Sequence, residues 1–222
     1  MRVPSLREMT GSPLAIVAFL VNVAPLVGVF FWGWQAGALV VLYWLENLVI
    51  GVVNIVRMAA SGVAHGGRGV GAAAFLIPFF CVHYGLFCFV HGMFVMLLFS
   101  GTGFDQLDPA GLLAAALGSA PHMGVLLAVI AVWKVVQFAV SFIWSGAFRR
   151  VTPPDVMASP YARIIFIHLA IFAGGFALMA LGQPIVGVIA LVLTKAAFDA
   201  VSEVWEARKA RETITGPAGG SA

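Results

Sequence analysis

The chain has 222 residues, of which 62% are hydrophobic and only 9% are charged, and its mean hydropathy is +1.04. Soluble domains carry about 25% charged residues, so this composition excludes an ordinary soluble domain. The formal net charge of +3 would suit an acidic partner such as nucleic acid, but the basic residues occur in small groups between hydrophobic runs, a pattern that sets membrane orientation. The sequence therefore predicts a polytopic membrane protein that binds no nucleic acid and whose site lies within its helical bundle.

The first hydrophobic run, residues 14–31, follows Arg2 and Arg7 and raises the question of a cleaved signal peptide. The hydrophobic core of a signal peptide is about 7 to 15 residues long. This run is longer, and it contains Asn22 and Pro25, which suit a retained helix packed against others. We therefore expect the run to be the first span of the mature protein.

The lengths of the apolar segments, and the Gly, Pro and charged residues that separate them, predict an all-α bundle of six transmembrane helices, residues 14–205. The spans are 14–33, 37–57, 74–99, 123–146, 162–181 and 184–205, each near the ~20 residues that cross a bilayer. Ten of the twelve Lys and Arg residues then fall on one side, which the positive-inside rule makes the cytoplasm. Residues 1–13 and the partly disordered tail 206–222 are thus predicted to be cytoplasmic, in the inner membrane of a bacterium.

Two connections have their own patterns. The loop 101–121 contains the apolar stretch GLLAAALGSA, which is too short to cross the membrane and predicts an external cap or interfacial helix. The segment 149–160 contains Pro153 and Pro154 and predicts a cytoplasmic turn that ends the fourth helix. Cys81 and Cys88 lie about 10 Å apart along one helix, too far for a disulfide.

Polar side chains interrupt the predicted spans. An ionisable group within a membrane costs at least about 2.5 to 3.5 kcal/mol, so each one needs a partner. Counting from the cytoplasmic ends of the helices places His83, His168 and Asp199 in one layer, with Glu46, Lys134 and Lys195 in the next. The remaining buried polar residues of interest are Asn47, Asn54 and His91. His91 lies about 12 Å from His83 along the same helix, too far for the two to share one metal ion.

The first hypothesis for this cluster is a metal site. Two imidazoles and a carboxylate, from His83, His168 and Asp199, would leave an open coordination position on zinc or iron. Glu46 and Lys195 would then act as catalytic groups of an intramembrane enzyme. No short HxxxH or HExxH motif occurs, so the ligands would have to converge from separate helices. A haem between His83 or His91 and His168 is a related alternative.

Two other hypotheses use the same residues. Carboxylates, lysines and histidines in series form proton relays, so the chain would suit a proton-coupled transporter of small molecules or ions. Alternatively, Glu46 and Asp199 balance Lys134 and Lys195, and the network only fastens the bundle of a structural or assembly module. The lipid bilayer is the expected partner, and a second copy of the chain or another membrane protein is left open.

Three runs of sequence carry a resemblance to a known family: YWLENLVIGVVNIVRM from Tyr43, HYGLFCFVHGMFV from His83 and KAAFDAVSE from Lys195. In these runs the chain resembles the bacterial multi-pass membrane proteins of the domain of unknown function DUF6498. The resemblance covers most of the membrane region. It implies an all-helical integral membrane fold and supplies no reaction, substrate or cofactor. The residues by which members look alike are Glu46, Asn47, His83, Gly85, His91, Gly92, Lys195 and Asp199.

Overall fold

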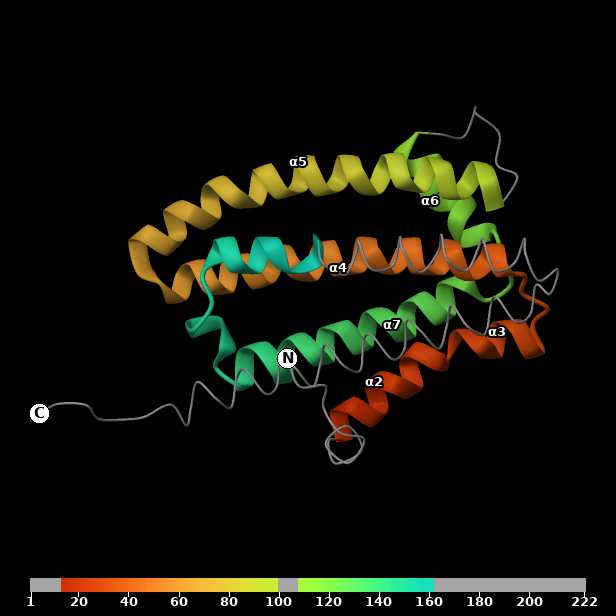
Figure 1. Ribbon diagram of the computed structural model, residues 1–222, viewed down its shortest axis with the longest axis horizontal. Coiled ribbons are helices and arrows are strands. Elements are labelled where there is room, and N and C mark those ends of the chain that lie inside the picture. The colour runs from red at the N-terminus through yellow and green to blue at the C-terminus, as the bar shows by residue number, and fades with distance from the viewer. Residues whose placement is uncertain (1–12, 100–107, 162–222) are drawn as a thin grey trace, which may run out of the picture.

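The computed structural model describes residues 13–99 and 108–161, and these residues form helices and no strand (Figure 1). The predicted all-helical fold is therefore confirmed for this part of the chain. Residues 1–12, 100–107 and 162–222 lie outside the described residues. The predicted spans 162–181 and 184–205 and most of the two predicted cytoplasmic termini fall in these ranges.

The first predicted span, 14–33, is divided into two helices, α2 at Pro13–Val23 and α3 at Pro25–Phe31. Pro25 has no amide hydrogen to donate to the preceding turn, so the helix is interrupted in front of it. The amide of Asn22 donates to the carbonyl of Ala18 at 2.9 Å, which satisfies this buried side chain within its own helix. The apolar stretch Ile16–Phe31 is shorter than the spans that follow.

The next two helices are longer than their predicted spans: α4 covers Ala36–Ala64 and α5 covers Gly66–Phe99. The glycine-rich sequence between the predicted spans resembles a loop, yet its small residues allow the two helices to approach closely. A Cβ atom on Gly62 would lie 2.7 Å from the Cβ atom of Ala73. The turn itself is confined to His65 and Gly66, and Gly66 adopts φ = +66°, a conformation that favours glycine.

The predicted interfacial helix is present as α6, Pro109–Gly118. The carboxylate of Asp108 caps it by accepting hydrogen bonds from the backbone amides of Ala110 and Gly111. The fourth predicted span corresponds to α7, Met123–Gln137, which continues as the π-helical segment η2, Phe138–Trp144. A short 3₁₀ helix, η3 at Ala147–Arg149, follows.

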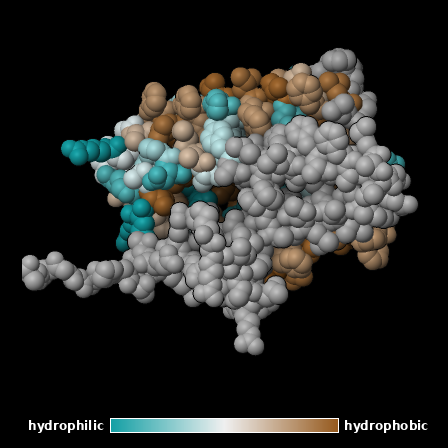
Figure 2. Space-filling model, viewed as in Figure 1, coloured by the Kyte–Doolittle hydropathy of each residue, from teal (hydrophilic) through white to brown (hydrophobic). Residues whose placement is uncertain are grey.

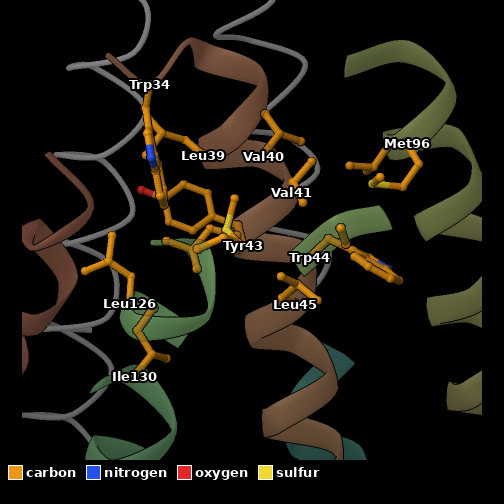
Figure 3. Packing of buried hydrophobic residues seen from close by; sticks show 14 of the residues in the cluster. Trp34, Leu39, Val40, Val41, Tyr43, Trp44, Leu45, Met96, Leu126 and Ile130 are labelled. Atoms are coloured by element: carbon orange, nitrogen blue, oxygen red, sulfur yellow. The ribbon is translucent and has the colours of Figure 1, made fainter. Parts of the chain in front are cut away.

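Helix α4 occupies the centre of the described bundle, with α5 along one side and α7 along the other (Figure 1). Trp44 extends from α4 toward α5, where its indole donates to the carbonyl of Cys88 at 2.8 Å (Figure 3). A Cβ atom on Gly92 would lie 2.3 Å from the Trp44 ring, so Gly92 provides the space for it. Tyr43 and Trp44 are both buried in the hydrophobic core.

The two ends of the bundle differ in charge. At the basic end, defined here by the α4–α5 turn and the loop 145–152, lie Arg68, Arg149 and Arg150. Figure 2 shows hydrophilic residues gathered at this end of the molecule. At the opposite end, the indole of Trp34 donates to the carbonyl of Pro121 at 2.9 Å. Helices α4 and α7 therefore run from the Trp34 end to the basic end, and α5 runs back.

Three described helices are long and apolar enough to cross a membrane: Ala36–Ala64, Gly66–Leu97 and Met123–Trp144. The outer face of α5 exposes a row of large apolar side chains, and hydrophobic residues follow this helix in Figure 2. Among them are Phe75, Phe79, Val82, Leu86 and Phe94. Helices of this length and surface indicate a lipid bilayer environment.

Candidate functional site

The clearest polar contact within the bundle joins α4 to α7. The ammonium Nζ of Lys134 lies 3.3 Å from the carboxylate Oε1 of Glu46. The Glu46 side chain is only 2% exposed and the Lys134 side chain 12% exposed, so both charges lie inside the protein. The sequence predicted that each of these residues needs a partner, and for this pair the structure provides it.

A second group of polar residues continues along the same helix toward the basic end. Asn47, Gly51 and Asn54 are buried at helical spacing and face α5 and the segment after η3. The hydroxyl of Tyr84 donates to the backbone carbonyl of Asn47 at 2.9 Å, and its ring covers Gly51. Ser159 donates to the Asn54 side-chain oxygen at 3.4 Å. Among the described residues, the amide nitrogen of Asn54 has no hydrogen-bond partner.

The segment after η3 forms a helix at residues 153–161 and packs against α4 and α5. Thr152 precedes it, and both the amide and the hydroxyl of Thr152 donate to the Asp155 carboxylate. These hydrogen bonds hold the pKa of Asp155 below its usual value. The arrangement resembles a capping box, which fixes where the helix begins. The predicted turn at 149–160 is thus a turn followed by a new helix.

His83 is positioned by Tyr161, the last described residue of that helix. Its Nδ1 atom lies 2.7 Å from the hydroxyl of Tyr161, and its ring stacks on Phe79 with an interplanar angle of 8°. This contact orients the imidazole ring from its Nδ1 side. Holding one imidazole nitrogen by a hydrogen bond is the usual way in which proteins orient a metal-binding histidine.

His91 lies two turns further along α5, with its ring stacked on Phe87 at an interplanar angle of 6°. Both imidazoles line an open groove of about 440 Å³ along α5. Its described lining is His83, Leu86, Phe87, Val90, His91 and Phe94. The groove is therefore mostly apolar and contains two imidazoles that lie about two helical turns apart.

Three of the predicted site residues, His168, Lys195 and Asp199, lie outside the described residues. Within the described ranges 13–99 and 108–161, no three His, Cys, Asp or Glu side chains converge as a metal site would require. The predicted ligand set therefore stays a prediction. Of the predicted residues that the structure describes, Glu46 contacts Lys134 and His83 contacts Tyr161.

Sequence reasoning missed several residues that hold these groups in place. Tyr161 orients His83, and Ser61 donates to the backbone carbonyl of Val151 at the basic end. Ser61 follows the predicted span 37–57 and Tyr161 precedes the predicted span 162–181. Neither position belongs to an apolar pattern that would have identified it from the sequence. The spacing Thr-Pro-Pro-Asp from Thr152 was an available signal, because a threonine three residues before an acid favours a helix start.

A comparison with protein families matched residues 5–215 to a family of unknown function, DUF6498. The chain belongs to this family. The match covers nearly the whole sequence, so both the described helices and the predicted spans beyond Tyr161 are part of the DUF6498 region. No curated protein and no solved structure matched the chain. Membership in DUF6498 confirms the predicted resemblance and leaves the activity open.

Proposed function

We propose that this chain is a structural or assembly module of the membrane, in which the Glu46–Lys134 ion pair fastens α4 to α7. The proposal includes the six predicted spans, with both termini in the cytoplasm of a bacterium. The ends of the described bundle support this orientation, because Arg68, Arg149 and Arg150 gather at one of them.

The observation that carries the proposal is the burial of a charge pair at the contact of two helices. Glu46 and Lys134 are 3.3 Å apart and almost excluded from solvent. At this distance each charge neutralises the other, so the two residues can remain in an apolar bundle. A carboxylate paired in this way joins two helices. Its burial can be explained by this structural role without a bound substrate.

Charge exchange tests the proposal. Glu46→Lys and Lys134→Glu each place two like charges in the bundle, and we expect either variant to lose most of its monodisperse protein in detergent. The exchanged double variant restores the opposite charges and should recover at least half of the wild-type yield. Arg149→Glu, at an exposed position, is the control for a charge reversal as such. A double variant no better than either single variant would contradict a purely structural pair.

Metal binding is a second candidate function, supported by the contact between His83 and Tyr161. With Nδ1 engaged by the Tyr161 hydroxyl, His83 presents Nε2 as a donor. His168 and Asp199 would complete the predicted set, and zinc or iron suits two imidazoles and a carboxylate. A bound ion would supply Lewis-acid chemistry or, for iron, redox chemistry.

Metal content by mass spectrometry, with a visible absorption spectrum for haem, tests this candidate on protein purified without chelators. A stoichiometric metal should be lost in His83→Ala and in His168→Ala. Tyr161→Phe should weaken the affinity about 10- to 100-fold, because it removes the group that orients the ligand. His65→Ala, at the α4–α5 turn, is the matched histidine control. Wild-type protein without metal would exclude the candidate.

A further inference from the structure

The basic end of the bundle exposes two cations that no described carboxylate neutralises. Arg68, in the first turn of α5, and Arg149, in η3, are both exposed. Within the ranges 13–99 and 108–161, neither guanidinium forms an ion pair. The acids of these ranges have other contacts, and they are Glu46, Asp108 and Asp155. Among the residues that the structure describes, this end therefore carries an uncompensated positive charge.

Two consecutive residues of α4 bring these arginines to one place. Ser61 donates to the backbone carbonyl two residues beyond Arg149. Its neighbour Gly62 packs against Gly69, in the turn of α5 that carries Arg68, because a Cβ atom on Gly62 would lie 3.0 Å from the Gly69 carbonyl oxygen. The loop that carries Arg149 and the first turn of α5 therefore flank the same point of α4.

This point lies at the ends of the helices that are long enough to cross a membrane, which are Ala36–Ala64, Gly66–Leu97 and Met123–Trp144. Trp144, the last residue of its span, is 78% exposed. Tryptophan is enriched where the hydrocarbon core of a bilayer meets the lipid headgroups. The chain turns at Gly146, which has φ = +72°, and Arg149 follows in the next turn. This order suits Trp144 at the hydrocarbon boundary and Arg149 at the level of the headgroups.

The contact that Arg149 makes is compatible with binding a phosphate. Its guanidinium carbon lies 5.1 Å from the centroid of the Phe148 ring. A guanidinium that packs on an aromatic ring uses its face, whereas it binds phosphate through the N–H groups at its edge. The ring can therefore hold the side chain while the same guanidinium donates to phosphate oxygens.

We propose that Arg68, Arg149 and Trp144 form a surface that binds the phosphate of an anionic phospholipid, in the leaflet at the basic end. Two positive charges favour a headgroup with a net negative charge, because they repel the ammonium of a zwitterionic headgroup. The exposed indole favours a lipid over a free phosphate ion, because only the lipid has an apolar part beside its phosphate. This headgroup surface is separate from the Glu46–Lys134 pair, so its failure would leave the proposed function unchanged.

Native mass spectrometry of the detergent-solubilised protein tests the headgroup surface, with phosphatidylglycerol and phosphatidylcholine of the same acyl chains as probes. One basic residue near an anionic surface is equivalent to a factor of about five in affinity. We therefore expect the wild type to bind phosphatidylglycerol about 25-fold more tightly than phosphatidylcholine. Arg68→Gln and Arg149→Gln should each weaken phosphatidylglycerol binding about fivefold and leave phosphatidylcholine binding unchanged. Arg149→Lys keeps the charge and should lose less than Arg149→Gln.

Controls separate this surface from net charge and from folding. Ala114→Glu changes the net charge by the same amount at an exposed position of α6, at the opposite end of the bundle, and should change the affinity less than about twofold. Trp144→Ala should weaken the binding of both lipids, because an indole contact does not depend on headgroup charge. The yield of Arg149→Glu, measured in detergent without added lipid, does not involve the headgroup surface.

Salt provides a test that needs no variant, so it holds even if a variant does not fold. Raising the ionic strength from about 0.1 M to about 1 M shortens the Debye length from about 10 Å to about 3 Å. The affinity of the wild type for phosphatidylglycerol should then fall toward its affinity for phosphatidylcholine.

Four outcomes would overturn the proposal. Two are equal affinities of the wild type for the two lipids, and an affinity for phosphatidylglycerol that the arginine variants do not change. The third is displacement of phosphatidylglycerol by inorganic phosphate at the same concentration, which would indicate a site for the free ion. For the fourth, a benzophenone amino acid in place of Trp144 should attach to phospholipid when native membranes are irradiated. Its attachment to another protein would mean that a protein covers this end.

Discussion

Neutralising the two members of the Glu46–Lys134 pair separately and together gives a quantitative test of its role. In Lys134→Met the buried Glu46 loses the ammonium group that lies 3.3 Å from it, and it can avoid carrying an uncompensated charge by taking up a proton. Protonating a glutamate at pH 7, well above its reference pKa of about 4.3 in water, costs about 3.7 kcal/mol. In Glu46→Gln the buried lysine can instead lose its proton, which costs about 4.6 kcal/mol from a reference pKa of about 10.4. These values are upper limits for each loss of stability.

The double variant Glu46→Gln with Lys134→Met removes both charges of the pair. Replacing a whole buried ion pair by uncharged groups of similar volume is often neutral or stabilising, whereas removing one partner costs about 3 to 5 kcal/mol. We therefore expect the double variant to be within about 1 kcal/mol of wild type. The coupling energy between the two positions should be correspondingly large.

The pH dependence has a defined sign. At pH 5 the cost of protonating Glu46 in Lys134→Met falls to about 1 kcal/mol, so this variant should regain most of its stability as the pH falls. Glu46→Gln should show no such recovery, because acid makes deprotonation of Lys134 harder. Only one of the two single variants is thus rescued by acid.

The assay is unfolding of detergent-purified protein by heat and by denaturant at pH 5 and pH 7, with all four proteins of the cycle. The structural interpretation requires two unstable single variants and a stable double variant. Two single variants that unfold like wild type would refute the reasoning, and so would a double variant that is as unstable as the sum of the two. If Glu46→Gln regained stability at pH 5, this would contradict the assignment of a negative charge to Glu46 and a positive charge to Lys134.

Two further predictions concern packing and capping. Gly51→Ala should lower the free energy of unfolding by about 1 to 3 kcal/mol, because the new Cβ atom would lie 2.6 Å from the buried Tyr84 ring. Gly85→Ala is the control: no described atom lies within 4 Å of its new Cβ atom, so it should be neutral or slightly stabilising in the same unfolding experiments. Asp155→Asn should cost at most about 1 kcal/mol at neutral pH, because the carboxylate is exposed. The hydrogen bonds from Thr152 lower the Asp155 pKa, so its contribution is complete above the unfolded pKa of about 3.9 and disappears as the pH falls through the folded value. A difference between wild type and Asp155→Asn that grows in acid would contradict this sign.

Parts of the site were predictable because they depend on the cost of burying charge. Glu46 and Lys134 were predicted to need partners from their position in apolar spans alone. Which acid would pair with which base was not predictable, since the sequence offered Asp199 and Lys195 as well. The contact depends on how α4 and α7 lie beside each other, and no local pattern encodes that.

The sequence alone determined that the chain is helical and apolar enough for a membrane, because helix formation and hydrophobic length are local properties. It also determined that residues 101–121 include a short helix, which is α6. The tertiary structure decided the limits of α4 and α5, where small residues in a glycine-rich stretch allow two helices to pack instead of forming a loop. It also decided that Tyr161 holds His83, a contact between residues 78 positions apart. Such contacts arise only when separate helices meet, so their register follows from packing and from no pattern within either segment.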